Sequence, residues 1–277
     1  MIDEGAGLNA VQQVALLGLR LRALDGASDA PLLGDDHSVA IARAMGLDLG
    51  KPALPRAVVL VHAVRARTLD DTVRRFVAVH PDAVVLDVGC GLDPRRARCA
   101  PPAGVDWYDV DFPEVTSLRE RFVPDPGHLV GTDVTTPGWL DAVPADRPVI
   151  VVTDGLQALL SGPSFIALAR AVTGHFRSGG EFAFNAYSRL ALRNGRRARG
   201  ALAMPVAGEG IDDPREPESW DAGLTLVEEL SMSRAPQVAR FPPLLRAMAR
   251  ITARSTRLAR TGDRVVRYRF APGAGHR

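Results

Sequence analysis

The feature that most constrains this chain is the run VVLDVGCGLD at residues 84–93. A β-branched, apolar stretch leads directly into Gly89 and Gly91, which predicts a buried strand ending in a turn where the backbone comes close to a ligand. Twenty residues after Gly89, the stretch 107–112 reads as a second strand with acids at its exit. Strand, glycine turn, helix and a second strand ending in a carboxylate is the layout that binds a nucleoside ribose on an α/β sheet.

The rest of the chain continues this alternation and predicts an α/β fold with a doubly wound sheet. The alternation lapses over residues 189–220, which read as an insertion. Residues 94–99, after the glycine turn, are expected to contain little helix. The expected strands are residues 83–89, 107–112, 128–133, 149–154, 181–187, 224–230 and 264–270. The expected helices are residues 8–24, 38–45, 56–80, 113–122, 138–143, 164–176 and 243–260.

Composition narrows the class of protein. With 277 residues, 46% of them hydrophobic, the chain suits one compact domain with an insertion or cap, or at most two domains. A formal net charge of +2 gives no reason to expect nucleic acid or a membrane as a partner. No stretch reads as a signal peptide or membrane helix, so we expect a cytoplasmic protein. Cys90 and Cys99 lack metal-ligand spacing and are expected to be buried free thiols, with no metal site.

The residues after Gly91 bear on the cofactor. Leu92, Asp93 and Pro94 follow, so the third glycine of a dinucleotide fingerprint is missing. That glycine lets a pyrophosphate approach a helix N-terminus, whereas a nucleoside without phosphates needs only a close backbone and a ribose carboxylate. The pattern favours S-adenosylmethionine over NAD. Of two acids on one strand face, Asp109 and Asp111, we expect Asp111 to hold the ribose because it stands at the strand end.

These motifs together resemble the leucine carboxyl methyltransferase family, and more closely its bacterial branch named for the tetracenomycin polyketide O-methyltransferase. The resemblance runs over nearly the whole chain. It is carried by DVGCGLDPRRAR (87–98), WYDVDFPEV (107–115), VQQ (11–13), LLGDD (32–36), Arg65 and Arg67 with Asp70-Asp71, ADRPV (145–149) and RYRF (267–270).

The resemblance implies a Rossmann-like class I methyltransferase with a seven-stranded, mostly parallel sheet, an antiparallel last strand and a helical cap. Residues 1–55 would form an N-terminal helical lid, and residues 56–277 the methyltransferase domain with a cap insertion at about 189–222. Arg67 would pair with the methionyl carboxylate of S-adenosylmethionine, and Asp154 would lie near its amino group. The remaining cofactor-binding residues would be Asp87, Gly89, Gly91, Asp111, Asp133 and Val134.

The acceptor is harder to infer. Methyl transfer from a sulfonium requires alignment above all, and a carboxylate acceptor is already ionised at pH 7, whereas a phenol profits from a general base. The chain departs from the family at Leu159, where a Tyr is common, and at His37-Ser38, where Pro-Tyr is common. The catalytic candidates are His37, Asn185 and Tyr187. Any of His37, His62, His80, His128 and His175 is a possible base, although an ordinary surface or helix-face histidine is the more common case, and His37 is singled out because it falls in the lid.

The sequence therefore predicts an S-adenosylmethionine-dependent O-methyltransferase acting on a carboxylate or phenol of a small molecule, in polyketide-like natural-product metabolism. One alternative is methylation of a protein C-terminal carboxylate. Another is a protein of this fold that binds the cofactor without transferring a methyl group. A nicotinamide oxidoreductase is disfavoured by the missing glycine. The residues leave the acceptor, its regiochemistry and the oligomeric state open.

Overall fold

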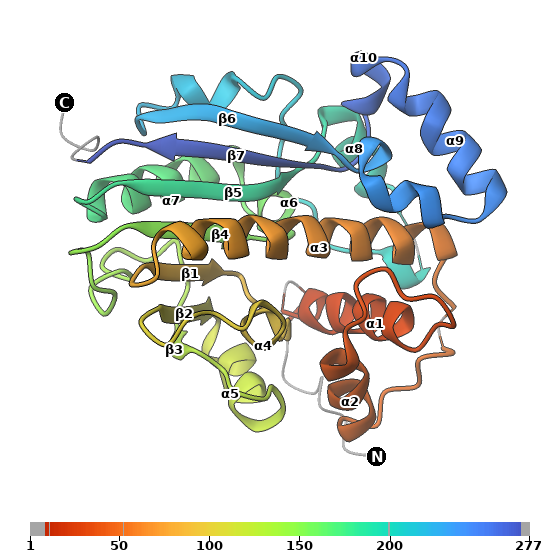
Figure 1. The fold of residues 1–277 in the computed structure, drawn as a ribbon, viewed down its shortest axis with the longest axis horizontal. Coiled ribbons are helices and arrows are strands. Elements are labelled where there is room, and N and C mark those ends of the chain that lie inside the picture. The colour runs from red at the N-terminus through yellow and green to blue at the C-terminus, as the bar shows by residue number, and fades with distance from the viewer. Residues whose placement is uncertain (1–8, 11, 52, 199, 273–277) are drawn as a thin grey trace.

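The core of the protein is one seven-stranded sheet with the order β3-β2-β1-β4-β5-β7-β6 (Figure 1). Neighbouring strands from β3 through β5 are parallel, while β7 runs antiparallel to both β5 and β6. The predicted fold class and antiparallel last strand are confirmed. The computed structural model describes residues 9–10, 12–51, 53–198 and 200–272. The strands are β1 (Val84–Val88), β2 (Asp106–Asp111), β3 (His128–Gly131), β4 (Val149–Thr153), β5 (Gly180–Ala186), β6 (Leu224–Ser231) and β7 (Arg264–Phe270).

Helices cover both faces of this sheet, with the long α3 lying across one face and α7 on the other (Figure 1). In β1, Val84, Leu86 and Val88 belong to the core on the α7 side, whereas Val85 belongs to the core that includes α3. The α-helices are α1 (Val14–Gly26), α2 (Asp36–Ala44), α3 (Arg56–Val79), α4 (Arg95–Cys99), α5 (Pro113–Phe122), α6 (Leu156–Leu159), α7 (Gly162–His175), α8 (Arg189–Gly195), α9 (Pro243–Ala253) and α10 (Thr256–Ala259). Short 3₁₀ turns are η1 (Gly200–Leu202), η2 (Glu216–Ser219), η3 (Met232–Arg234) and η4 (Pro236–Arg240).

The strand order reverses at β1, which is hydrogen-bonded to β2 on one side and to β4 on the other. Connections leave the carboxyl ends of these two neighbours in opposite directions, which opens a crevice at that edge of the sheet. A ligand site is therefore expected beyond the ends of β1, β2 and β4.

The N-terminal segment packs as a separate small layer beside the sheet. Leu19 of α1 and Ile41 of α2 form a third apolar cluster that also contains Leu92 of the glycine turn. The Asp25 carboxylate at the end of α1 accepts backbone N–H groups from the following loop, at 2.9 Å from Leu33 N. Asp35 caps α2, since its side chain accepts a hydrogen bond from Ser38 N. These bonds fix α1 and α2 against the turn, and their action as a lid stays a prediction.

Three sequence expectations about elements were wrong. Residues 95–99 form helix α4, because Arg95 and Arg98 are drawn inward to buried acids rather than left in a solvated loop. Residues 138–143 form turns rather than a helix, starting from Gly138 at φ +81°. The helix expected over 243–260 is divided into α9 and α10, with Ser255 capping the second. Val11 and the tail 273–277 are not among the described residues.

Cys90 and Cys99 are both free and buried, as expected. Among the described residues, no helix combines the length and the apolar character that crossing a lipid bilayer requires.

Candidate functional site

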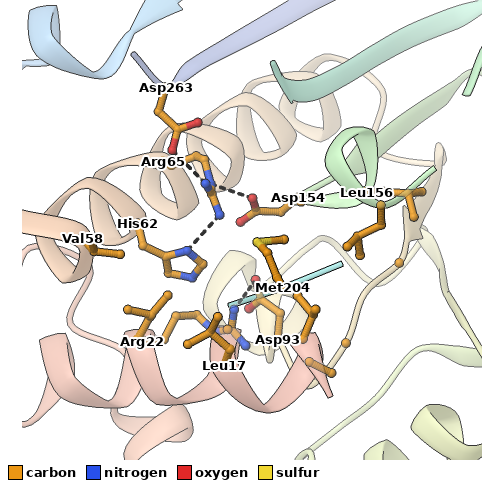
Figure 2. Close-up of a pocket in the computed structure, with 18 of the residues that line it drawn as sticks. Leu17, Arg22, Val58, His62, Arg65, Asp93, Asp154, Leu156, Met204 and Asp263 are labelled. Atoms are coloured by element: carbon orange, nitrogen blue, oxygen red, sulfur yellow. Dashed lines mark hydrogen bonds and ion pairs between the residues drawn. The ribbon is translucent and has the colours of Figure 1, made fainter. Parts of the chain in front are cut away.

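A pocket of about 620 Å³ lies at the crevice beyond the carboxyl ends of β1, β2 and β4 (Figure 2). We divide its walls by chemistry. The polar half comprises residues 89–93, Asp111, Asp154 and Arg65. The apolar half comes mainly from helices and includes Leu17 and Leu21 of α1, Val58 and Val61 of α3, and Leu202 and Met204. His62, one helical turn from both Val58 and Arg65, lies between the halves.

The floor of the polar half is the glycine turn. Gly89 has φ +67°, and a Cβ there would lie 3.3 Å from Leu156 Cδ1, so a side chain would strain the backbone and crowd the pocket. Gly89 N donates to Val110 O at 2.8 Å, which ties the turn to β2. On its outer side, the buried Arg119 donates to Gly91 O and to Asp93 O, both at 2.9 Å. The turn is therefore held in place before any ligand arrives.

Asp111 lies at the end of β2, facing the glycine turn. One carboxylate oxygen accepts from Gly91 N and the other from Phe112 N, both at 2.8 Å. Burial raises the pKa of Asp111, and these two amide hydrogen bonds oppose the rise. A carboxylate has about four acceptor positions, so two remain for hydroxyl groups of a ligand in the pocket.

The neighbouring Asp109 has a different role. It is fully buried, accepts from Arg119 Nη2 at 2.5 Å, and also accepts from Trp107 Nε1 at 3.0 Å. Asp109 therefore fixes Arg119, and through it the glycine turn. The expectation that Asp111 rather than Asp109 meets the ligand agrees with this geometry.

Arg65 is the centre of the polar cluster on α3. Its Nε lies 2.7 Å from Asp154 Oδ1, and its Nη1 donates to Asp263 Oδ2 and to the Tyr187 hydroxyl, both at 2.8 Å. Its Nη2 lies 2.9 Å from His62 Nδ1. Although burial alone would lower it, the nearby Asp154 carboxylate holds the pKa of Arg65 well above its usual value. Figure 2 shows this guanidinium between Asp263, Asp154 and the His62 ring.

The Asp154 carboxylate is charged but incompletely satisfied. Burial favours its neutral form, yet Arg65 holds the pKa of Asp154 below its usual value. The ion pair with Arg65 lacks hydrogen-bond geometry, and neither Asp154 oxygen has a hydrogen-bond donor among the described residues. A buried carboxylate without a donor is costly, so a cationic or N–H group of a ligand would satisfy it.

Arg67, which the resemblance implied as a cofactor ligand, lies elsewhere. Its side chain is 43% exposed and its Nε is 3.2 Å from both oxygens of Asp71, on the same helix. It is not among the residues that line the pocket, whereas Arg65 is. Two residues along a helix differ by about 200°, so Arg65 and Arg67 cannot face the same way. Arg65, and not Arg67, therefore lies in the wall of the pocket.

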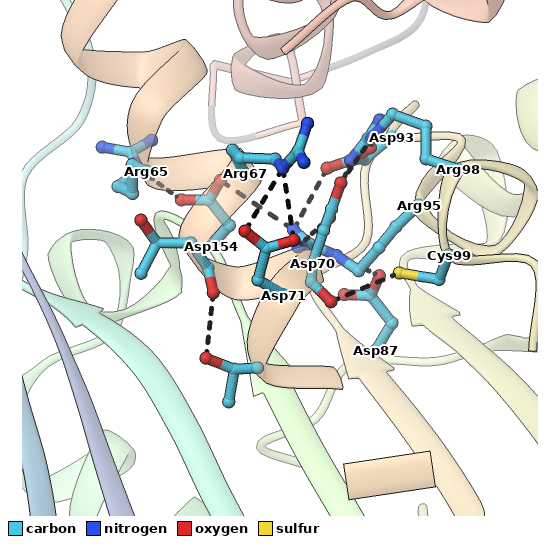
Figure 3. A network of polar contacts seen from close by, with 12 residues as sticks. Arg65, Arg67, Asp70, Asp71, Asp87, Asp93, Arg95, Arg98, Cys99 and Asp154 are labelled. Carbon is cyan, nitrogen blue, oxygen red and sulfur yellow. Dashed lines mark hydrogen bonds and ion pairs between the residues drawn. The ribbon is translucent and has the colours of Figure 1, made fainter. Parts of the chain in front are cut away.

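Beneath the turn lies a network of buried ion pairs (Figure 3). Arg95 contacts Asp70 at 2.9 Å, Asp87 at 3.0 Å and Asp93 at 3.1 Å. Burial raises the pKa of Asp87 to about 7 in spite of Arg95. Arg98 and Arg22 complete the network: Arg98 contacts Asp70, Asp35 and Asp93 at 2.7, 2.7 and 2.6 Å, and Arg22 contacts Asp93 at 3.5 Å. The network ties α1, α2, α3 and α4 to the turn.

The structure brings most of the predicted cofactor residues together. Asp87, Gly89, Gly91, Asp111 and Asp154 all line the pocket. Asp133 and Val134 do not: Asp133 is exposed and accepts from Thr135 N at 2.8 Å, and Val134 packs against the main core.

The catalytic candidates are also divided. Tyr187 lines the pocket, and burial raises the pKa of its hydroxyl. Asn185 is fully buried behind the pocket, where its Oδ1 accepts from Gly155 N at 2.6 Å and so supports the turn after Asp154. His37 lies exposed on α2 and does not line the pocket.

Sequence reasoning missed two charged residues that support the pocket, Arg22 and Arg119, and gave His62 only as one of five possible bases. A stronger signal existed for His62. Val58, His62, Arg65 and Leu69 recur at spacings of three and four, which places them on one helix face with an apolar surround. For Arg22 and Arg119 the sequence carried no signal, because a buried arginine is recognisable only when its acidic partners are known.

Fold and site together define a class I methyltransferase, the class whose methyl donor is S-adenosylmethionine. The profile of the leucine carboxyl methyltransferase family matches residues 15–154. The chain is 37% identical to the tetracenomycin polyketide synthesis O-methyltransferase TcmP of Streptomyces glaucescens, over 97% of this chain and 100% of that protein. It is 30% identical to the S-adenosyl-L-methionine-dependent methyltransferase dpfgK of Gibberella zeae, over 83% and 85% of the two chains. The chain belongs to the leucine carboxyl methyltransferase family, as its motifs predicted.

Solved structures agree on the fold. A protein from Thermobifida fusca YX assigned as a methyltransferase superimposes with a TM-score of 0.54 at 16% identity, covering 91% of this chain and 94% of that one. The N-methyltransferase NodS from Bradyrhizobium japonicum WM9, solved with S-adenosyl-L-homocysteine, gives 0.50 at 12% identity, covering 95% and 99%. These likenesses support the fold alone.

The residues present fit S-adenosylmethionine. The orphaned Asp154 carboxylate suits the positive methionyl ammonium, and the glycine turn gives the side-chain-free surface that a nucleoside needs. Asp111, with acceptor positions left over, suits the ribose hydroxyls.

Proposed function

We propose that this enzyme transfers a methyl group from S-adenosylmethionine to a carboxylate or phenol oxygen of a small molecule of polyketide-like, natural-product metabolism. Its similarity to a tetracenomycin polyketide synthesis O-methyltransferase over nearly the full length of both chains supports this class of substrate. The observation that carries the proposal is the pocket itself: an unsatisfied Asp154 carboxylate lies in the same cavity as an apolar half able to take an aromatic acceptor.

On the cofactor side, residues of this chain bind and orient S-adenosylmethionine. Asp111 would hold the ribose, Asp154 the methionyl ammonium, and Arg65 would keep Asp154 ionised and in place. When bound, S-adenosylmethionine supplies the electrophilic methyl group. Asp133 and Val134 remain our proposed neighbours of the adenine, since they follow β3 at the same edge of the sheet.

On the acceptor side, the walls of the pocket exclude water and align the acceptor with the methyl group. The N-terminal segment, which we propose acts as a lid, contributes Leu17 and Leu21, and the insertion contributes Leu202 and Met204. An apolar wall attracts an aromatic or aliphatic body without fixing its polar groups, so it suits a hydrophobic acceptor whose oxygen reaches toward the polar half.

The pocket favours an acceptor that arrives ionised. Burial, reinforced by Arg65, lowers the pKa of His62 to about 3, and its Nδ1 is already occupied by Arg65. Tyr187 is half-buried and its hydroxyl accepts a hydrogen bond from Arg65, and Asp154 is ion-paired. None of these three groups is free to take a proton at neutral pH. A carboxylate, ionised at pH 7, therefore fits the site better than a neutral phenol.

The test uses a probe that bears both kinds of oxygen on an apolar body, 3-hydroxy-2-naphthoate. Calorimetry first measures S-adenosylmethionine binding by the purified enzyme. Incubation with the probe is then followed by release of S-adenosylhomocysteine and by mass spectrometry of the product. We expect a methyl ester in excess over a methyl ether. No cofactor binding, or binding without turnover of the naphthoate and of related aromatic acids, would overturn the proposal.

A further inference from the structure

The second ring nitrogen of His62 is a buried polar atom of the pocket that the proposed cofactor binding does not use. The side chain is 7% exposed and lines the pocket, yet its Nε2 has no hydrogen-bond partner among the described residues. A buried donor or acceptor left unpaired is destabilising, and a group bound in the pocket would recover this loss by pairing with it.

The contact at the first ring nitrogen decides what Nε2 offers. His62 Nδ1 lies 2.9 Å from Arg65 Nη2. A guanidinium only donates hydrogen bonds, so Nδ1 accepts and carries no proton. A neutral imidazole then has its proton on Nε2, and His62 presents an N–H donor rather than a basic lone pair.

Arg65 is itself fixed by Asp154, Asp263 and Tyr187, and this leaves the imidazole little freedom to turn. Figure 2 shows the ring beneath Arg65, between the Arg22 and Leu17 side chains of α1 and Met204. His62 thus lies at the junction of the two halves, with the apolar Leu17 and Met204 and the charged Arg22 around it.

We propose that His62 Nε2–H binds the oxygen of the methyl acceptor and holds it at the junction between the apolar half and the polar half. This assignment rests on the proposed function, because it places the acceptor in the apolar half. The class of ligand it selects is an apolar body carrying a hydrogen-bond-accepting oxygen with no proton of its own to give: an ionised carboxylate or a phenolate. A neutral hydroxyl can satisfy the donor, but it gains less because a charged acceptor makes the stronger hydrogen bond.

Two near-isosteric substitutions separate the two nitrogens. In His62→Asn, the side-chain oxygen can replace Nδ1 as acceptor for Arg65, and the Nε2 donor is lost. In His62→Gln, the side-chain amide nitrogen can reach the position of Nε2, and the Nδ1 acceptor is lost. His37→Asn, at an exposed histidine outside the pocket, is the matched control.

The measurements are kcat/KM for 3-hydroxy-2-naphthoate and the Kd of S-adenosylhomocysteine for each variant. We expect His62→Asn to lose about 10- to 100-fold in kcat/KM, the usual worth of a hydrogen bond to a charged group, with cofactor affinity within about threefold of the wild type. His62→Gln should recover most of that loss. The reverse pattern, a damaged Gln variant with weak cofactor binding and an active Asn variant, would mean that His62 serves only to place Arg65, and would overturn the proposal.

Nitrogen-15 NMR of histidine-labelled enzyme gives a test that needs no turnover. The resonances of His62 are assigned by their loss in His62→Asn. We expect a protonated Nε2 and an unprotonated Nδ1 at pH 7, and a downfield shift of the Nε2 proton when 3-hydroxy-2-naphthoate is added to the S-adenosylhomocysteine complex. The opposite tautomer, or an Nε2 proton unmoved by a bound naphthoate, contradicts the assignment. A wild type that binds cofactor but no aromatic acid instead defeats the acceptor class of the proposed function, and this inference with it.

Discussion

The two halves of the pocket are built in different ways. The polar half comes mainly from the ends of β1, β2 and β4, and its groups are fixed by short hydrogen bonds, such as those from Gly91 N to Asp111 and from Arg65 to Asp263. The apolar half comes mainly from α1, α3 and residues 202–204, and its walls are aliphatic side chains and methionine.

This difference means that the polar half must keep its residues in place, whereas the side chains of the apolar half can be exchanged. Directional ion pairs and hydrogen bonds tolerate small displacements badly, so the polar half suits a ligand that never changes. Apolar contacts have no preferred direction, and hydrophobic side chains of similar volume replace one another for less than about 1.5 kcal/mol. We therefore expect proteins with this pocket to share the cofactor and to differ in the acceptor.

The sharpest test of the polar half compares Arg65→Gln with Arg67→Gln. Removing Arg65 leaves Asp154 and Asp263 buried without their cation, which should cost about 3–5 kcal/mol of unfolding free energy and abolish measurable cofactor binding. Arg67 pairs with Asp71 at a half-exposed site, so its loss should cost less than about 1 kcal/mol. Urea unfolding and calorimetry with S-adenosylhomocysteine measure both.

Equal effects of the two substitutions would contradict the assignment of Arg65 to the pocket. If Arg65→Gln does not fold, Arg65→Lys retains the charge but not the fork that contacts Asp263, Tyr187 and His62 together. It should then fold and still bind the cofactor weakly.

The pH dependence of the unfolding free energy tests His62, which lies between the two halves. Burial, with Arg65 second, lowers the pKa of His62 from its ordinary 6.5 to about 3. Between these values the unfolded chain binds a proton at this position and the folded protein does not, so His62 makes stability fall as the pH is lowered through this window. The slope approaches about 1.4 kcal/mol for each pH unit below pH 6, and the loss of stability between pH 6.5 and 4.5 is roughly 2 kcal/mol.

The measurement is the free energy of unfolding as a function of pH. His62→Asn should flatten the slope over this window, while His37→Asn, at an exposed histidine of α2, should leave the wild-type slope unchanged. An equally steep profile in His62→Asn would mean that the imidazole is not held neutral.

The residues of the polar half were easier to predict from the sequence than those of the apolar half. Asp111 and Asp154 were predictable because acids at the carboxyl ends of parallel strands meet at one edge of the sheet. Arg65 was confused with Arg67 because a motif identifies a neighbourhood, and only the helix phase identifies the face. The apolar half depends on how α1 and the 202–204 segment pack against α3, and ordinary leucines and methionines carry no mark of which cavity they will line.

The fold itself was more accessible than the site. Apolar runs such as 149–153 specify buried parallel strands by composition alone. Helix α4 was missed because its stability comes from buried pairs of Arg95 and Arg98 with acids on other elements, which local propensity does not contain.

A milder change in the polar half is Asp111→Asn. The amide keeps the size of the carboxylate and one acceptor oxygen, so the turn should survive, but its NH₂ group faces a backbone N–H in place of an acceptor. Loss of a charged hydrogen-bond acceptor should weaken S-adenosylhomocysteine binding by about 10- to 100-fold, or roughly 1.5–3 kcal/mol. Calorimetry measures the Kd, and adenine alone, which lacks the ribose, serves as the control ligand. Unchanged affinity would remove Asp111 from the ribose site.

The smallest effect should come from the apolar half. Leu17 is a half-buried wall of the pocket, so Leu17→Ala removes contact area from the acceptor with little cost to the core. Losing part of a buried aliphatic side chain is worth about 1 kcal/mol, which predicts a roughly fivefold rise in the KM for 3-hydroxy-2-naphthoate and no change in the Kd of S-adenosylhomocysteine. Leu258→Ala, at a 49% exposed leucine of α10 outside the pocket, should change neither. If Leu17→Ala instead weakens the cofactor and spares the acceptor, α1 belongs to the polar half and the division of the pocket drawn here is wrong.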